Sequence, residues 1–216
     1  DKRHPALKPS GKQPSSVKNT DLLNLHHKHW DDVINNVDDL KSAIYDFQIA
    51  VLGYQFPQQD CPYPISSGIY VGLWWHHKFE KAKWKKDRLD IIFRAFFWSN
   101  VLTQRYDQGF LTQMATDLHE IKQFLKRTEK TSHKKWIQEA KKFLDNMFKN
   151  SSNPNQMPTK TDVKDMLTTI KPRGAMRAGL KLPVQYRVTS DIIDSKQKVS
   201  FPQVTDIQLH HIFPKK

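Results

Sequence analysis

The 216-residue sequence predicts a mainly α fold, in which a helical bundle domain is followed by the start of a β-rich module. Three observations support this prediction. From residue 30 to about residue 170, apolar residues recur at steps of three and four, the period of an amphipathic helix. Segments with the composition of β-strands, separated by polar turns, begin only after Pro183. The aromatic content (6 Trp, 6 Tyr and 12 Phe) favours a folded chain over a disordered one.

The sequence divides into three segments. Residues 1–20 carry Lys, Pro and Ser without periodicity and are expected to form an extended lead-in. Residues 21–182 form the helical domain, and residues 183–216 open the β-rich module. The first residue is not Met, and no signal-peptide pattern follows it, so we expect a domain boundary inside a longer protein.

The first half of the helical domain contains three apolar helical segments. An amphipathic stripe runs from Trp30 to Val51 and is closed by Gly53, after which a Pro-broken loop follows. The stretch 69–79 is ambiguous between strand and helix from its apolar density. We favour a helix that continues through the basic residues 80–90. The stretch 89–106 is apolar nearly all round, which predicts a central helix buried on most sides.

Further helices are expected in the second half. Apolar stripes over 110–125 and 136–148 each predict one helix, and a short helix over 163–170 ends before Pro172. "RGAMRAGLKL" (173–182) predicts one more helix, whose small residues permit close packing. Beyond it, "VQYRVTSDII", "KVSFPQV" and "DIQLHHIF" have the composition of strands.

The composition limits the class of partner and the compartment. Lys and Arg total 35 against 22 acids, and the net charge of +13 favours a polyanion, with nucleic acid first and an anionic membrane surface second. A merely soluble basic protein is the open alternative. Cys61 is the single cysteine, which excludes disulfides within the chain and a Cys-based zinc site, and favours a reducing cytoplasm. No apolar run approaches the roughly 18 residues that span a bilayer.

The sequence ends on the motif with the most specific chemistry, "DIQLHHIFPKK". A His-His pair near a strand end, followed by two apolar residues and Pro, suits the start of a ββα-metal (HNH) nuclease site. Adjacent strand residues point to opposite faces, so the two imidazoles can take separate roles. On this interpretation His211 is the general base and His210 a ligand of Mg²⁺ or Mn²⁺. The alternative is a pair of surface histidines in a basic tail, as we expect for the pairs at 26–29 and 76–77.

The motif "HHIFPK" resembles the opening strand of HNH nucleases in the GmrSD-type restriction family, whose architecture SspE-type phage-defence effectors share. Four segments that precede the motif occur in the same order as in the family: "HWDDVINNVDDLKSAIYDF", "CPYPISSGIYVGLWW", "IIFRAFFWSNVLTQRYDQG" and "KPRGAMRAGL". The resemblance covers residues 29–216 and implies a DNA endonuclease with an N-terminal ParB-like partner domain. That domain and the later HNH residues do not occur in this sequence, so the fragment alone is expected to lack parts of the site.

Two basic stretches are candidates for contact with the DNA backbone. The first enters the β-rich module and supplies five predicted DNA-binding residues, Lys171, Arg173, Arg177, Lys181 and Arg187. The second is "HHKFEKAKWKKDR" (76–88), with Trp84 between its lysines. For each stretch a solvated helix face is the competing interpretation.

Most tryptophans are expected in the core, and Arg105 and Tyr106 are expected to be structural, with Asp117 as a buried charge partner.

These observations give two hypotheses. The first is a metal-dependent DNA endonuclease of a GmrSD- or SspE-like anti-phage system, located in the cytoplasm. The second is a non-catalytic, basic helical module that binds DNA or protein and regulates a neighbouring domain.

Overall fold

The computed structural model describes residues 27–53, 56, 60–80, 82–107, 110–149, 160–161, 164, 174–187 and 196, with side chains of the last helix described as far as Pro183. Within these residues the chain is mainly helical, as predicted, and contains no strand. The helices are α2 (His27–Asn35), α3 (Val37–Leu52), α4 (Ser66–Lys78), α5 (Lys86–Thr103), α6 (Phe110–Arg127), α7 (His133–Lys149) and α9 (Gly174–Arg187). The β-rich module expected at 183–216 lies almost wholly outside the described residues.

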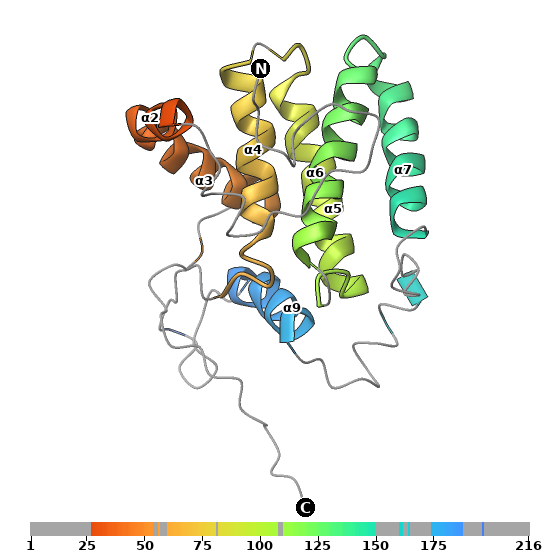
Figure 1. The fold of residues 1–216 in the computed structure, drawn as a ribbon. Helices are drawn as coiled ribbons and strands as arrows, with labels where there is room; N and C mark the ends of the chain where they lie inside the picture. The colour runs from red at the N-terminus through yellow and green to blue at the C-terminus, as the bar shows by residue number, and fades with distance from the viewer. Residues whose placement is uncertain are drawn as a thin grey trace, which may run out of the picture.

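Helix α5 is the centre of the bundle. It packs against α3, α4, α7 and α9, and α4 in turn packs against α6 (Figure 1). Phe93, Phe96 and Phe97 are fully buried, so the prediction of a central helix buried on most sides is confirmed. Phe47 of α3 lies among four aromatic rings at centroid distances of 5.8 to 6.2 Å, those of Phe56, Tyr70, Phe93 and Phe97. The core is therefore largely aromatic.

Side chains of α5 also complete the end of α3. The left-handed Gly53 (φ 89°) closes α3 as predicted, and its N–H donates to the carbonyl of Ile49 at 2.9 Å. Arg94 Nε donates to the carbonyl of Ala50 at 2.5 Å, and Trp98 Nε1 donates to that of Val51 at 3.1 Å. Helix-terminal carbonyls have no partner within the helix, so these bonds satisfy groups that α3 leaves open. Trp98 is structural, as expected.

The stripe expected to run from Trp30 to Val51 as one helix is divided. Asn36 leaves the helical conformation (φ −122°, ψ 29°), and its side-chain amide donates to the carbonyl of Asp32 at 2.7 Å. A side chain that bonds the preceding turn competes with helix continuation. Helix α2 has no buried residue, and Trp30 and Ile34 are 45% and 67% exposed. Their apolar side chains therefore do not contribute to the core.

Two further boundaries differ from the prediction. The helix expected to continue from 69–79 through 80–90 is broken after α4, and Trp84, in the segment between α4 and α5, is buried at 3% exposure. Helix α9 passes through Pro183 and continues to Arg187, so the first four residues of the expected strand "VQYRVTSDII" are helical. Periodicity alone did not separate a short helix from a strand there.

A buried ion pair joins three helices. Arg105, just after α5, donates to both carboxylate oxygens of Asp117 on α6, at 2.7 Å through Nη2 and 3.3 Å through Nε. Its Nη1 donates to the carbonyl of Met147 on α7 at 3.2 Å. Tyr106 donates to Asp117 at 2.8 Å, and burial, with the charge of Asp117, holds the pKa of that phenol well above its usual value. The predicted structural role of Arg105 and Tyr106 is confirmed.

Helix α9 approaches α5 through a glycine. A Cβ atom added at Gly179 would lie 2.5 Å from Cγ1 of Val101, a distance that real side chains do not show. Val101 is itself buried and its branched side chain has little freedom to move. The small residues expected to permit close packing in this helix do so at Gly179.

The Gly179→Ala variant is therefore expected to lose about 1 to 2 kcal/mol of unfolding free energy, because overpacking outweighs the helix-propensity gain. Gly68→Ala is the matched control. Gly68 is exposed within α4 with no atom near its Cβ position, so alanine there is expected to stabilise by about 0.5 to 1 kcal/mol. Urea denaturation of both variants measures the difference, and a stabilised Gly179→Ala protein would contradict the close approach of α9 to α5.

Candidate nucleic-acid interface

The predicted catalytic pair lies outside the described residues. His211, His210, Lys171 and Arg173 are all in this category, so the structure gives no geometry for them. Within the part of the chain that is described, no three His, Cys, Asp or Glu side chains are grouped so that they could hold a metal ion. The predicted ligand His210 is not among the residues on which that finding rests.

The other predicted DNA-binding residues lie on α9. Arg177 is exposed, as a DNA contact requires. Lys181 is mostly covered, and its ammonium group is 3.4 Å from a carboxylate oxygen of Asp60. Arg187 is the last residue of α9, and its side chain is not among those described. Of the two whose side chains are described, Arg177 is thus the one that the structure presents to solvent.

The second basic stretch, 76–88, is largely built into the fold. Lys78 pairs with Asp39 of α3, and Lys86 pairs with Asp90 at 2.9 Å and Asp46 at 3.5 Å. Trp84, which lies between the lysines in the sequence, is buried and cannot act as a stacking surface. Because Lys78 and Lys86 already have carboxylate partners, only Lys83 and Lys85 of its described lysines are exposed without one, and this stretch is a weaker candidate for phosphate contact.

Arg88, the last cation of that stretch, is a structural residue. It is buried, and its guanidinium reaches the turn between α6 and α7. Nη1 donates to the carbonyls of Thr128 at 2.6 Å and Glu129 at 3.3 Å, and Nη2 donates to that of Thr131. The guanidinium also lies 5.4 Å from the ring centroid of Trp136. It thus fixes the backbone of the turn against α5.

The same turn is fastened by side chains of its own helices. Thr128 Oγ1 donates to the carbonyl of Phe124 at 2.8 Å and accepts from Trp136 Nε1 at 3.0 Å. Trp136 and Phe124 are buried, with ring centroids 6.1 Å apart. The α6–α7 hairpin is therefore anchored by buried groups, and its outer surface is presented in a fixed position.

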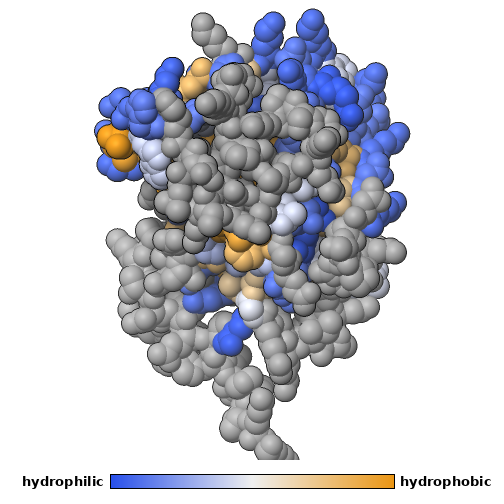
Figure 2. Space-filling model, in the orientation of Figure 1, coloured by the Kyte–Doolittle hydropathy of each residue, from blue (hydrophilic) through white to orange (hydrophobic). Residues whose placement is uncertain are grey.

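That outer surface is strongly basic. Between residues 122 and 149 the sequence has nine cationic residues and three acidic ones; the cations are Lys122, Lys126, Arg127, Lys130, Lys134, Lys135, Lys141, Lys142 and Lys149. All but Lys122 are exposed. We call these eight exposed side chains the basic hairpin face. In Figure 2 hydrophilic side chains cover the edge of the molecule where α7 lies.

The lysines of α7 share one side of the helix. Lys135, Lys142 and Lys149 are seven residues apart, as are Lys134 and Lys141, which is two turns of helix. Among the described residues, the one close carboxylate contact of this row joins Lys135 to Glu139 at 3.8 Å, and such exposed pairs contribute little. The row can therefore neutralise a polyanion that runs along α7.

The basic hairpin face was not predicted from the sequence. The signal was present as "KRTEKTSHKKW" and the "KK" at 141–142, which carry cations at helical spacing opposite the apolar stripe. Burial explains the difference between this stretch and 76–88: the hairpin's cations point away from the core, and no acidic helix lies beside them among the described elements.

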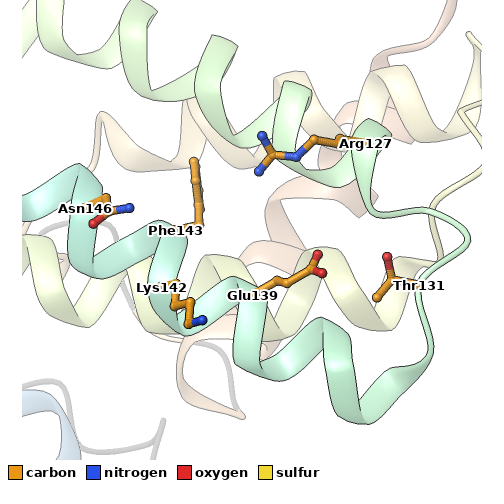
Figure 3. Close-up of a pocket in the computed structure, with 6 residues that line it drawn as sticks. All are labelled: Arg127, Thr131, Glu139, Lys142, Phe143 and Asn146. Carbon is orange, nitrogen blue, oxygen red and sulfur yellow. The ribbon is translucent and has the colours of Figure 1, made fainter.

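A groove opens beside the basic hairpin face. Its volume is about 630 Å³, and six residues line it: Arg127 of α6, Thr131 of the turn, and Glu139, Lys142, Phe143 and Asn146 of α7 (Figure 3). Phe143 stacks on Phe124 of α6 with centroids 4.6 Å apart and ring planes 13° apart. The two helices thus meet through long aromatic side chains, which leaves room between their backbones.

Comparison with known proteins gives no identification. No protein-family model, no curated protein and no solved structure matches the chain. No helix in the described part of the chain is both long and apolar enough to cross a membrane.

Proposed function

We propose that the chain is the DNA-binding and cleaving part of a metal-dependent endonuclease that acts on foreign DNA, similar to GmrSD-type and SspE-type restriction proteins. The observation that carries the proposal is the terminal motif "HHIFPK", with His210 and His211 adjacent ahead of an apolar pair and proline. The described residues before it are mainly helical, which is what the resemblance implies for this part of the chain.

In this proposal His211 accepts a proton from water, and the resulting hydroxide attacks the scissile phosphorus. His210 would help to hold Mg²⁺ or Mn²⁺, which neutralises charge on the phosphate and stabilises the leaving oxygen. A ParB-like domain elsewhere in the same protein is the proposed regulatory partner.

The helical body would bind the DNA that the motif cuts. The basic hairpin face supports this part of the proposal, because its cations are exposed and, apart from Lys135, have no close carboxylate among the described residues. The same observation favours the second candidate function, a non-catalytic DNA-binding module that regulates a neighbouring domain. Metal-dependent plasmid cleavage that requires His211 separates the two functions.

Binding of duplex DNA is expected to depend on the basic hairpin face in a salt-dependent way. Each lost phosphate contact reduces the slope of log K against log salt by about 0.9, so Lys134→Gln/Lys141→Gln should reduce it by about 2. Arg177→Gln tests the predicted surface on α9, and Lys41→Gln, at an exposed position of α3, is the control. Fluorescence anisotropy over a range of salt concentrations measures all four proteins. Unchanged slopes in the double variant would remove the hairpin from the binding surface.

A further inference from the structure

The groove between α6 and α7 is lined by cations, an aromatic ring, a carboxylate and an amide. Arg127 and Lys142 supply two cations from opposite helices. Phe143 supplies an aromatic ring, and Glu139 and Asn146 supply a carboxylate and an amide on the same helix. Among the described residues, neither Arg127 nor Lys142 has a carboxylate within ion-pair distance, so both cations are available to a ligand.

The position of the cations favours phosphate. Arg127 projects from α6 over the groove, while Lys142 projects from α7 on the other side (Figure 3). The Arg127 guanidinium is held 5.9 Å from the ring centroid of Phe124, which directs the side chain along the groove. A guanidinium forms bidentate hydrogen bonds with phosphate oxygens, and a lysine ammonium adds a point charge.

The remaining lining residues argue against a site for phosphate alone. Glu139 is half-buried, and its carboxylate repels the negatively charged phosphate groups of a nucleic acid backbone. It can, however, accept hydrogen bonds from the amino and imino groups of a base edge. Phe124 covers one face of the Phe143 ring, so Phe143 offers its other face or its edge to the groove. Base–aromatic contact is the usual way in which proteins hold unstacked bases.

We propose that this groove binds one nucleotide, with its phosphate between Arg127 and Lys142 and its base against Phe143, within reach of Glu139 and Asn146. The nucleotide belongs to a nucleic acid strand, because the basic hairpin face continues from the groove along α7. The proposal rests on the proposed DNA-binding function and adds to it a preference for an unpaired nucleotide. Within duplex DNA the base would first have to leave its stack.

Two charge-matched double variants test the groove. Arg127→Gln/Lys142→Gln removes both lining cations, whereas Lys126→Gln/Lys141→Gln removes their immediate neighbours, which are exposed but do not line the groove. Each variant removes two positive charges from the same two helices. Affinity for a short, fluorescently labelled single strand is measured at fixed salt, beside an abasic strand of equal length, and thermal melting checks that each variant is folded.

We expect the lining variant to lose roughly tenfold more affinity for the normal strand than the neighbour variant, which loses only its backbone phosphate contacts. Phe143→Leu should reduce the preference for the normal over the abasic strand by roughly fivefold, while its affinity for the abasic strand stays unchanged. Equal losses in the two double variants, or equal affinity for the two strands in the parent protein, would overturn the proposal.

A competition experiment distinguishes a nucleotide within a strand from a free nucleotide as the ligand of the groove. A free deoxynucleoside monophosphate that displaces the strand from the parent protein, and is not bound by Arg127→Gln/Lys142→Gln, would assign the groove to free nucleotides. Failure of the groove is distinguishable from failure of the proposed function. In the first case strand binding persists and both double variants weaken it equally. In the second, the parent protein itself binds neither the strand nor duplex DNA, which also overturns the groove.

Discussion

The Asp117→Ala variant is expected to unfold with a free energy about 3 to 5 kcal/mol lower than that of the parent chain. Asp117 is fully buried and accepts hydrogen bonds from Arg105, Tyr106 and Gln113. Its removal leaves the guanidinium of Arg105 buried without a counter-charge and leaves the Tyr106 hydroxyl without an acceptor. Both costs are those of desolvated groups that lose a partner.

Chemical denaturation monitored by tryptophan fluorescence measures the loss. Gln123→Ala, at an exposed position of the same helix, is the control and is expected to stay within about 0.5 kcal/mol of the parent. The double variant Arg105→Met/Asp117→Leu should be more stable than Asp117→Ala, because no uncompensated charge is then buried. A double variant that is no more stable than Asp117→Ala would contradict the attribution of the loss to the unpaired charge of Arg105.

The second large effect is expected on DNA cleavage. His211→Ala should reduce conversion of supercoiled plasmid to open-circular or linear DNA by a factor of about 10² to 10⁴, the usual contribution of a positioned general base. The assay uses the protein in its full natural length, with Mg²⁺ or Mn²⁺, and chelation of the metal should abolish cleavage. His77→Ala, from another adjacent histidine pair, is the matched control and should retain activity within about twofold of the parent.

His210→Ala distinguishes the two roles within the motif. Loss of a metal ligand raises the metal concentration needed for activity, so its cleavage should recover in part as Mn²⁺ increases. Recovery is not expected for His211→Ala, because added metal does not replace a base. Equal cleavage by the parent and His211→Ala would refute the assignment of the base. No cleavage by any protein, with salt-dependent DNA binding intact, would favour the regulatory module.

Much of the helical body could be predicted from periodicity. The stripes over 110–125 and 136–148 correspond to α6 and α7, and the apolar stretch 89–106 is the central helix α5. Prediction of the Arg105–Asp117 pair was also possible, because a charged residue beside an apolar helix needs a buried counter-charge. These features depend on residues close in sequence or on the general cost of burying charge.

Features that depend on tertiary neighbours could not be predicted. Whether a lysine is available to DNA depends on the acids that other helices place beside it. Lys78 meets Asp39, and Lys86 meets Asp46, each about forty residues away in the sequence. For this reason Lys78 and Lys86 are engaged within the fold, although the stretch 76–88 resembles a phosphate-binding surface in the sequence. The division of α2 from α3 depends in the same way on the side-chain bond of Asn36.

The bonds of Arg88 to the turn between α6 and α7 limit how that turn can change in length. Surface turns usually tolerate inserted residues, because little depends on their backbone positions. Here three carbonyl groups, those of Thr128, Glu129 and Thr131, face a single guanidinium. An inserted residue would move at least one carbonyl away from Arg88 and leave donors of a buried cation unsatisfied. Sequence variants with a longer or shorter turn should therefore be rare wherever this arginine is kept.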